Sequence, residues 1–379
     1  MTTPAQHAVA ADHVFDGAAV RRHAAVLIDG TRIVDVVARG EVPPTMAVRE
    51  MRAGAWLAPG FIDLQVNGGG DCLFNDNPTV EGIATIAAAH RKCGTTALLP
   101  TLVTDTTAKM SVALAAVKTA SERDPGVLGI HLEGPFLSPE KPGVHDRRLI
   151  RAPTPGDAEM LTVPRKGVML VTLAPERVPD GFIARLAASG ARVSLGHSVA
   201  SYSETRAAMA AGLTGFTHLF NAMPPLLSRA PGPIAAALEA SNAWYGLIVD
   251  GIHVDPAVLR VALRGAGHPM LVSDAMPPVG GSGSTFRLYG EPIRVADGRC
   301  TRADGTLAGA FLTVAQAVRN CVRLLDVPLE AALRMGSTNP ARFIGLGDVL
   351  GRLAPGYRAD MVAFDPASFD ILETWVAGR

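Results

Sequence analysis

The chain has 379 residues, of which 48% are hydrophobic, and its 35 basic and 35 acidic side chains give a formal net charge of zero at pH 7. This length is sufficient for one large domain with a small appendage, and the apolar content excludes a largely disordered chain. Because there is no overall basic field, neither nucleic acid nor an anionic membrane is expected as the main partner, although a local phosphate site needs only one or two cations.

The first 55 residues contain short β-type segments rather than the pattern of a large domain. Residues 25–28 and 32–37 are typical of strands, and Gly30 and Gly40 mark turns beside them. A few short strands do not bury a core by themselves, so this region needs a partner from elsewhere in the chain.

From residue 56 onward a unit recurs in which a short apolar run ends at a polar residue or glycine and is followed by a helix-like segment. Alanine-rich stretches with helical spacing follow several runs, for example at residues 80–92 and 106–123, and Asp105 and Ser201 stand where helix N-caps are expected. Apolar runs that alternate with helices predict parallel strands covered on both faces. Eight such units predict a (β/α)8 TIM-type barrel over residues 56–347. The eight runs are residues 56–66, 96–103, 127–132, 167–173, 191–195, 213–219, 245–249 and 270–273.

The end of the chain returns to short strands. Residues 360–364 are typical of a strand, and Gly351 and Gly356 mark turns. We predict that residues 1–55 and 348–379 pair into one small β-sandwich domain beside the barrel. Residues 280–305 are also rich in strand and turn signals, and they either extend this domain or form an insertion.

Polar side chains follow six of the eight predicted strands, at the end where the active site of such a barrel lies. A single histidine or aspartate at a strand end is weak evidence, since it is more often a structural residue or a helix cap. Six polar strand ends at one rim indicate a site. The residues concerned are Asp63, Gln65, Asn67, His131, Glu133, His197, His218, Asn221, Asp250, His253 and Asp274.

Glu133, His197 and His218 could converge as one carboxylate and two imidazoles, a common ligand set for a catalytic zinc ion. The same set suits ferrous iron, so the ligands do not fix the metal. We predict one divalent ion per subunit, with Zn²⁺ favoured and Fe²⁺ as the alternative. Such an ion lowers the pKa of a bound water and polarises a carbonyl oxygen. Asp274 could then act first as the base and afterwards as the acid in the hydrolysis of an amide.

Six motifs resemble those of the amidohydrolase superfamily, and within it the N-acetylglucosamine-6-phosphate deacetylases. They read PGFIDLQVNGG from Pro59, HLEGPFL from His131, LGHS from Leu195, THLFNAMP from Thr217, DGIH from Asp250 and VSDA from Val272. The resemblance runs nearly end to end. It implies that the protein removes the acetyl group from N-acetylglucosamine 6-phosphate or a close relative. It also implies that Glu133, His197 and His218 bind the metal and that Asp274 is the acid–base residue.

The resemblance further implies a sugar-phosphate site that two subunits share. Arg229 is expected to reach the phosphate bound by the neighbouring subunit, which implies a homodimer, and a guanidinium suits a phosphate through its forked donors. His253 or His145 is expected to hold the sugar and to help polarise the acetyl group. The residues placed around the substrate are Val144, His145, Asn221, Ala222, Arg229, Asp250, His253, Leu307, Ala308 and Gly309.

The chain departs from many amidohydrolases at the end of the first strand. Gln65 and Asn67 stand where those proteins carry His-x-His for a second metal, and amides are far weaker ligands than imidazoles. No lysine ends the fourth run, where Ala174 is followed by Pro175. We therefore predict a mononuclear site with Gln65 and Asn67 near the metal.

Three alternatives stay open. The protein could deacetylate another N-acetyl sugar, such as N-acetylgalactosamine 6-phosphate or an unphosphorylated sugar; it could be an amidohydrolase for another amide; or it could be a non-catalytic barrel. Residues 1–16 lack the pattern of a signal peptide, and no run of about 20 apolar residues predicts a membrane span. The four cysteines have no metal-binding spacing, so we expect free thiols and a cytoplasmic protein.

Overall fold

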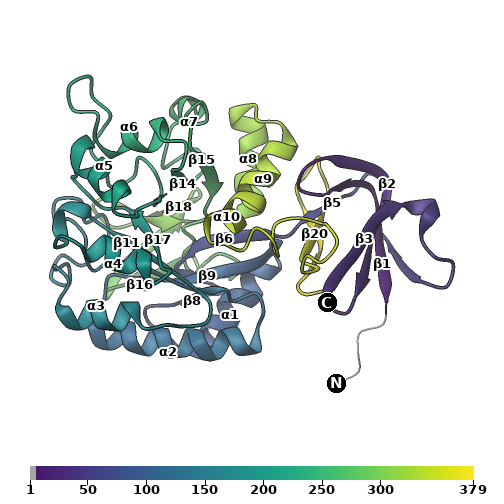
Figure 1. Cartoon of the computed structure of the whole chain (residues 1–379), viewed down its shortest axis with the longest axis horizontal. Coiled ribbons are helices and arrows are strands. Elements are labelled where there is room, and N and C mark those ends of the chain that lie inside the picture. The colour runs from purple at the N-terminus through teal and green to yellow at the C-terminus, as the bar shows by residue number, and fades with distance from the viewer. Residues whose placement is uncertain (1–5) are drawn as a thin grey trace.

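The computed structural model describes residues 6–379, and over this range the chain forms a large α/β barrel beside a small β-domain (Figure 1). Eight parallel strands of this range pair in the order β15-β14-β13-β12-β11-β10-β9-β6. A parallel bridge between Val66 and Ala275 joins the two ends of this sheet, so the predicted barrel is confirmed. The strands are β6 (Phe61–Val66), β9 (Thr95–Val103), β10 (Gly129–Glu133), β11 (Val168–Leu173), β12 (Arg192–Leu195), β13 (Gly215–Phe216), β14 (Trp244–Leu247) and β15 (His268–Leu271).

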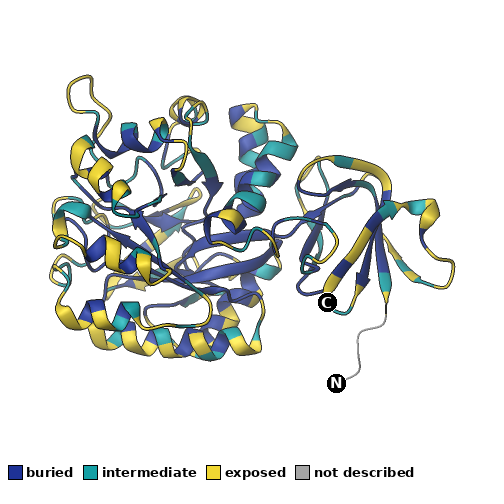
Figure 2. Cartoon of the chain, in the orientation of Figure 1, coloured by how far each residue is buried: buried dark blue, intermediate teal, exposed yellow. Residues whose placement is uncertain are grey.

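Helices cover the outside of the barrel, each with one buried face and one exposed face (Figure 2). Threonine or serine side chains cap several of them, which satisfies backbone N–H groups of the first turn. Ser201 is such a cap, as predicted, whereas the cap of α2 is Thr106 and not Asp105, because the Thr106 hydroxyl accepts the Lys109 N–H. The helices are α1 (Val80–Arg91), α2 (Thr107–Arg123), α3 (Pro155–Thr162), α4 (Phe182–Ala188), α5 (Tyr202–Ala210), α6 (Gly232–Glu239), α7 (Pro256–Ala262), α8 (Val314–Leu325), α9 (Leu329–Gly336) and α10 (Thr338–Phe343), with short 3₁₀ turns η1 (Arg39–Glu41) and η2 (Pro175–Arg177).

Both ends of the chain build the small domain, as predicted. Its strands pair in the order β21-β20-β5-β1-β2-β3, and β4 adds to β1. The link between the two chain ends is the antiparallel pairing of β5 with β20. Alternate side chains of β1 and β2 bury apolar groups on the two faces of the sheet, for example Val9 and Val26 on one face and Ala8 and Leu27 on the other. The strands are β1 (His7–Phe15), β2 (Val20–Asp29), β3 (Arg32–Ala38), β4 (Ala47–Glu50), β5 (Trp56–Pro59), β20 (Met361–Phe364) and β21 (Ile371–Trp375).

The structure differs from the prediction at the first apolar run, which is two strands and not one. β5 belongs to the small sheet, β6 belongs to the barrel, and Gly60 lies between them. A Cβ at Gly60 would lie 2.1 Å from the Thr96 side chain, so only glycine fits at this crossing. The domain limits at residues 55 and 348 stay predictions, and residues 1–5 of the first segment lie outside the described residues.

Residues 280–305 contribute to an insertion beside the barrel mouth and do not extend the small domain. Strands β16 (Thr285–Leu288), β17 (Glu291–Ala296), β18 (Arg299–Thr301) and β19 (Leu307–Ala310) form a separate antiparallel sheet. Its apolar face packs on Leu73, Val103 and Val144, which follow or end elements of the barrel rim. A short hairpin of β7 (Gly68–Gly69) and β8 (Cys72–Leu73) completes this side. The insertion therefore forms one wall of the site described below.

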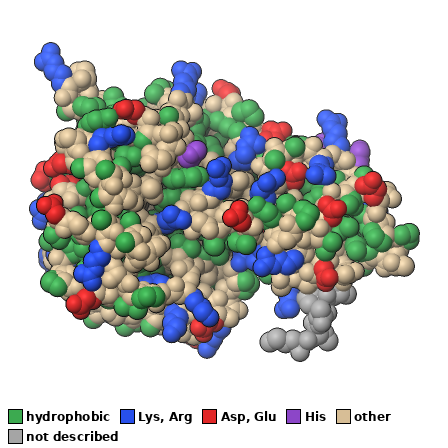
Figure 3. Space-filling model, viewed as in Figure 1, with side chains coloured by type: hydrophobic (Ala, Val, Ile, Leu, Met, Phe, Trp, Pro, Cys, Tyr) green, Lys and Arg blue, Asp and Glu red, His purple; other side chains and the backbone are tan. Residues whose placement is uncertain are grey.

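Charged side chains of both signs are interspersed over the face in view, together with apolar groups (Figure 3). Within residues 6–379, no helix has the length and apolar character needed to cross a bilayer.

Candidate metal centre and active site

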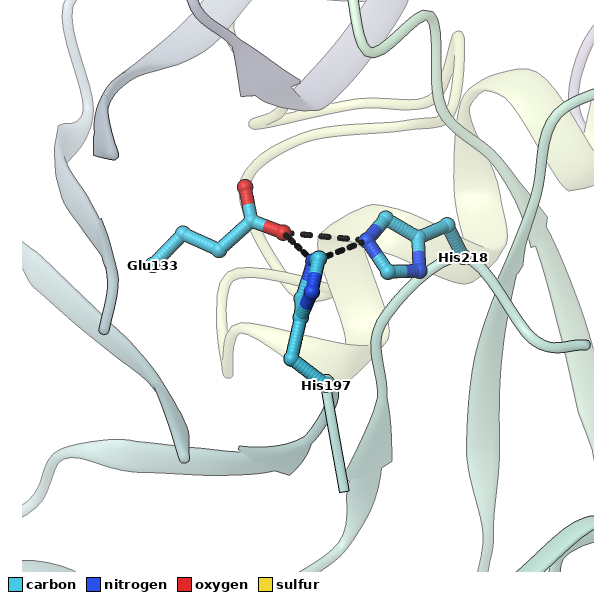
Figure 4. Close-up of side chains that lie close together, drawn as sticks. All are labelled: Glu133, His197 and His218. Carbon is cyan, nitrogen blue, oxygen red and sulfur yellow. Dashed lines mark hydrogen bonds and ion pairs between the residues drawn. The ribbon is translucent and has the colours of Figure 1, made fainter. Parts of the chain in front are cut away.

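Glu133, His197 and His218 meet at the carboxyl ends of three barrel strands (Figure 4). Glu133 is the last residue of β10, and the two histidines lie two residues beyond the ends of β12 and β13. The Nε2 atoms of His197 and His218 lie 3.1 and 3.0 Å from Oε1 of Glu133 and 3.1 Å from each other. All three side chains are buried. Among the described residues these atoms form a group that could hold a metal ion.

The spacing and protonation of this cluster fit a divalent ion. With metal–ligand bonds of about 2.1 Å, neighbouring ligand atoms lie about 3.0–3.4 Å apart. Nδ1 of His197 lies 2.8 Å from the Lys141 carbonyl oxygen, so this nitrogen carries the proton and the Nε2 lone pair faces the cluster. A carboxylate oxygen and an imidazole lone pair repel each other at 3.1 Å unless a cation or a proton lies between them.

The electrostatics of the cluster favour an ionised carboxylate. Burial by itself would raise the pKa of Glu133, but the contacts of its carboxylate with the imidazoles of His197 and His218, together with the charge of His218, outweigh burial, and the pKa lies well below its usual value. Burial likewise would lower the pKa of His218, whereas the hydrogen bond and the charge of Glu133 raise it. Glu133 therefore supplies the negative charge that a divalent ion needs.

Asp274 lies beyond the eighth strand, beside the cluster. Its Oδ1 accepts hydrogen bonds from Nδ2 of Asn67 at 2.6 Å and from Nε2 of Gln65 at 3.1 Å. The same Gln65 nitrogen lies 3.2 Å from Oε2 of Glu133, so this amide links the two carboxylates. Burial, and then the charge of Glu133, raises the pKa of Asp274 to about 6. Gln65 and Asn67 thus lie beside the cluster and direct amide N–H groups at its neighbouring carboxylates, while their nearness to a metal stays a prediction.

Backbone strain marks the same positions. His197, His218 and Asp274 have φ values of 49°, 32° and 50°, in the left-handed region that residues other than glycine rarely adopt. Such conformations persist where the surrounding structure fixes them, and they gather at functional sites. These three residues lie two or three positions beyond the ends of β12, β13 and β15, and all of them line one cavity.

This cavity has a volume of about 240 Å³ and opens at the rim of the barrel. Most of the residues predicted for the site line it, and so do five that the sequence reasoning missed. The predicted ones are Asn67, Glu133, Val144, His145, His197, His218, Asn221, Ala222, His253, Asp274, Leu307 and Gly309, and the missed ones are Val103, Gly143, Ile248, Met276 and Thr306.

Comparison with known proteins agrees with this geometry. The sequence profile of the amidohydrolase family matches residues 56–379. The chain belongs to the amidohydrolase family. An N-acetylgalactosamine-6-phosphate deacetylase from Shewanella sp. (strain ANA-3) is 44% identical over 329 residues, covering 85% of this chain and 82% of the relative. An N-acetylglucosamine-6-phosphate deacetylase from Haemophilus influenzae is 34% identical over 365 residues, 95% of each chain. The crystal structure of N-acetylglucosamine-6-phosphate deacetylase from Pasteurella multocida matches with a TM-score of 0.94 and 33% identity over 99% of both chains.

Four of the residues assigned to the metal, to catalysis or to the substrate do not line the cavity of this amidohydrolase, and neither do Asp63 and His131 of the strand-end set. Gln65 lies behind it, bonded to Glu133 and Asp274, and Ala308 is buried within β19. Asp250 holds His253 from outside, with 2.6 Å between its Oδ2 and Nδ1 of that ring. Arg229 is exposed in the loop between β13 and α6, which projects from the barrel in Figure 1. A role for Arg229 therefore requires something outside this cavity.

Thr104, which the sequence reasoning did not single out, controls His145. The Thr104 backbone N–H points at Nδ1 of His145 at 3.3 Å, and the Thr104 hydroxyl lies 2.7 Å from the same nitrogen. Nδ1 therefore accepts, and the proton of the neutral ring is on Nε2, which lies 3.9 Å from Oε1 of Glu133. Burial lowers the pKa of His145 to about 3, so the ring is neutral at pH 7. Thr104 is the polar residue directly after the second apolar run, and this position was the signal that could have identified it.

Proposed function

We propose that this amidohydrolase removes the acetyl group of N-acetylglucosamine 6-phosphate and releases glucosamine 6-phosphate and acetate. The observation that carries the proposal is the buried cluster of Glu133, His197 and His218 with Asp274 lining the same cavity. Relatives that match nearly the whole chain are named as deacetylases of N-acetylated hexosamine 6-phosphates, which supports the substrate class.

The proposal includes one divalent metal ion held by Glu133, His197 and His218, with zinc favoured and ferrous iron as the alternative. When bound, such an ion lowers the pKa of a water and polarises an amide carbonyl. Gln65 and Asn67 direct N–H groups, which cannot bind a cation, toward the carboxylates. This arrangement supports a single ion.

Asp274 is the proposed catalytic acid and base. It takes a proton from the attacking water while the new C–O bond forms at the acetyl carbon. It then gives that proton to the amide nitrogen as the C–N bond breaks, so acetate and a free amine leave. A carboxyl whose pKa is raised to about 6 by burial can accept and return a proton near neutral pH. The amides of Asn67 and Gln65 hold one of its oxygens.

The remaining cavity residues are proposed to hold the sugar. His145 presents a neutral Nε2–H, a donor suited to the acetyl oxygen or a sugar hydroxyl, and His253 is oriented by Asp250. Val144, Asn221, Ala222, Leu307 and Gly309 form the surrounding walls, and Ala308 supports them from within β19.

Arg229 is proposed to complete the phosphate site of a neighbouring subunit in a homodimer. Two observations support this: the side chain is exposed, and it does not line the cavity of its own subunit. Exposed Leu226 and Leu227 lie in the same loop and offer apolar surface to a partner. Arg229→Ala should then raise KM for the phosphorylated sugar strongly, whereas Arg206→Ala, an exposed arginine on α5, should leave KM unchanged. A cytoplasmic location is part of the same proposal, and all four cysteines are free thiols.

A second candidate substrate is N-acetylgalactosamine 6-phosphate, because a relative of that name shares 44% identity with this chain. The two sugars differ in the configuration of one hydroxyl group, and both present the same acetamide and phosphate. The metal centre would serve either of them equally.

The deciding experiment measures acetate release from the two phosphorylated sugars and from unphosphorylated N-acetylglucosamine, with the metal content read on the same sample. The proposal predicts about one ion per chain, turnover of N-acetylglucosamine 6-phosphate above the other two, and little turnover without the phosphate. Faster turnover of N-acetylgalactosamine 6-phosphate would show that this second candidate is the substrate. Turnover of none of the three with the metal bound would discard the substrate class.

A further inference from the structure

Inside the barrel, adjacent to the metal centre, five buried polar side chains form one hydrogen-bonded chain. Thr101, His131, Thr172 and Ser194 lie on the consecutive strands β9, β10, β11 and β12, and Thr217 directly follows β13. All five are at most 6% exposed. We call this set the polar belt. The proposed mechanism gives none of these residues a role.

Every neighbouring pair in the polar belt is within hydrogen-bond distance. Thr101 Oγ1 lies 3.2 Å from Nδ1 of His131, and Nε2 of the same ring lies 2.7 Å from Thr172 Oγ1. Thr172 Oγ1 lies 2.6 Å from Thr217 Oγ1, which lies 3.0 Å from Ser194 Oγ. On the other side, the Val66 N–H of β6 donates to Thr101 Oγ1 at 2.9 Å. The belt thus links six consecutive strands of the barrel.

The proton of each group can be placed in turn. Thr217 donates its single hydroxyl proton to Ser194, so the 2.6 Å contact with Thr172 needs the proton of Thr172. Thr172 then has no proton left for His131, and the ring must donate through Nε2–H. Nδ1 of the neutral ring is left as the acceptor for the Thr101 hydroxyl.

The opposite direction fails at one contact. If Nδ1 of His131 carried the proton, Thr172 would have to donate to Nε2, and Thr217 already donates to Ser194. Two hydroxyl oxygens would then face each other at 2.6 Å with no proton between them. Given the Thr217–Ser194 bond, each of the four contacts in the belt has one proton only when the belt runs from Thr101 toward Ser194. The Thr101 hydroxyl also lies 3.3 Å from the Leu99 carbonyl oxygen, a second acceptor for its proton. Buried networks of this kind are rigid when they are complete.

The belt is tied to two of the three residues of the metal centre. Glu133 lies two residues after His131, on the same face of β10, and its register partner on β11 is Thr172. His218 directly follows Thr217 in the chain. We propose that the polar belt is a positioning device: it fixes His131 as the Nε2–H tautomer and holds the ends of β10 and β13 so that Glu133 and His218 meet at the distance a metal ion needs. The inference rests on the metal centre of the proposed function but not on the identity of the sugar.

The test uses zinc alone as the probe on the full chain. Thr172→Val keeps the shape of the side chain and removes the hydroxyl, Thr172→Ser keeps the hydroxyl, and Thr205→Val is the matched control. Thr205 is equally buried, but its hydroxyl bonds to the Ser201 carbonyl within α5 at 2.8 Å. Zinc affinity is measured by competition with a chelator, and ¹⁵N NMR of the imidazoles identifies the tautomer of His131.

We expect Thr172→Val to weaken zinc binding about tenfold, the lower end of the effect of removing a group bonded directly to a metal ligand, because Thr172 acts on the ligands through His131, Thr217 and the strands that carry them. Thr172→Ser should restore most of the affinity, and Thr205→Val should leave it unchanged. The unchanged protein should show His131 protonated at Nε2. Unaltered zinc affinity in Thr172→Val, an equal loss in Thr205→Val, or a ring protonated at Nδ1 would each overturn the inference. If the unchanged protein binds zinc but does not deacetylate the sugar phosphate, the proposed substrate is wrong and the role of the polar belt is unaffected.

Discussion

Replacing the Asp274 carboxylate by an amide removes its capacity for proton transfer and leaves the other groups of the site in place. In Asp274→Asn the amide oxygen can still accept the 2.6 Å bond from Asn67 and the 3.1 Å bond from Gln65, so the local structure should survive. The variant lacks the basic oxygen that takes the proton of the attacking water. General acid–base catalysis contributes about 10²- to 10⁴-fold, which raises the barrier by about 2.7–5.4 kcal/mol when it is lost.

The assay is steady-state acetate release, with metal content and thermal unfolding measured on the same preparation. We expect kcat to fall by about 10²- to 10⁴-fold, with one ion per chain retained. Asp348→Asn, an exposed aspartate outside the cavity, serves as the control and should behave like the unchanged protein. If Asp274→Asn kept most of its turnover with the metal in place, another group would have to be the base, and the proposed mechanism would be wrong.

Three further predictions concern the support of the site and the stability of the fold. Thr104→Val should lower kcat/KM about tenfold, equivalent to the loss of one hydrogen bond of about 1.4 kcal/mol to His145. Thr104→Ser should recover the activity. An unchanged kcat/KM in Thr104→Val would contradict the conclusion that Thr104 fixes the His145 ring. Burial alone would raise the pKa of Asp157, but the bidentate contact with Arg151 and the bonds from Thr154 lower it to about 2. The stabilising contribution, at most about 2 kcal/mol, is therefore complete above pH 4 and is lost as the pH falls toward 2. In urea, Asp157→Asn should unfold with a free energy lower by this amount at pH 7, and the difference from the unchanged protein should shrink below pH 4. A difference in the free energy of unfolding that does not change with pH would refute the assignment. Gly60→Ala should lower the free energy of unfolding by about 1–3 kcal/mol because the added methyl has no space, and a neutral effect in the same assay would show that the two strands can shift apart.

The sequence was sufficient for the barrel and for the residues that gather at its rim. Parallel strands end at one edge, so the polar residues after each apolar run had to meet there whatever the details of the helices. Glu133, His197 and His218 follow three different runs, and their convergence needed only the order of the strands. The parallel direction and the order of the strands were therefore enough to predict that these three residues meet.

The parts that could not be predicted depend on close packing between distant segments. The dipeptide Pro59-Gly60 is a local turn signal between β5 and β6 that the prediction did not use, whereas the need for glycine at this crossing is set by the Thr96 side chain on the next strand. The pairing of Thr104 with His145 joins residues 41 positions apart. Threonines such as Thr172 are common in strands, and a hydrogen-bonded belt is visible only once neighbouring strands are in register.

The pairing of β5 with β20 bears on the order in which the protein can be made. Synthesis produces β1 to β5 first, yet β20, the partner strand of β5, follows only after the whole barrel. Until then the edge of β5 offers unpaired backbone groups to any other strand. A nascent or truncated chain that ends before Met361 would carry this open edge together with a nearly complete barrel. Synthesis of β20 thus closes the sheet, and we expect chains that stop before it to aggregate even where every residue of the metal centre is present.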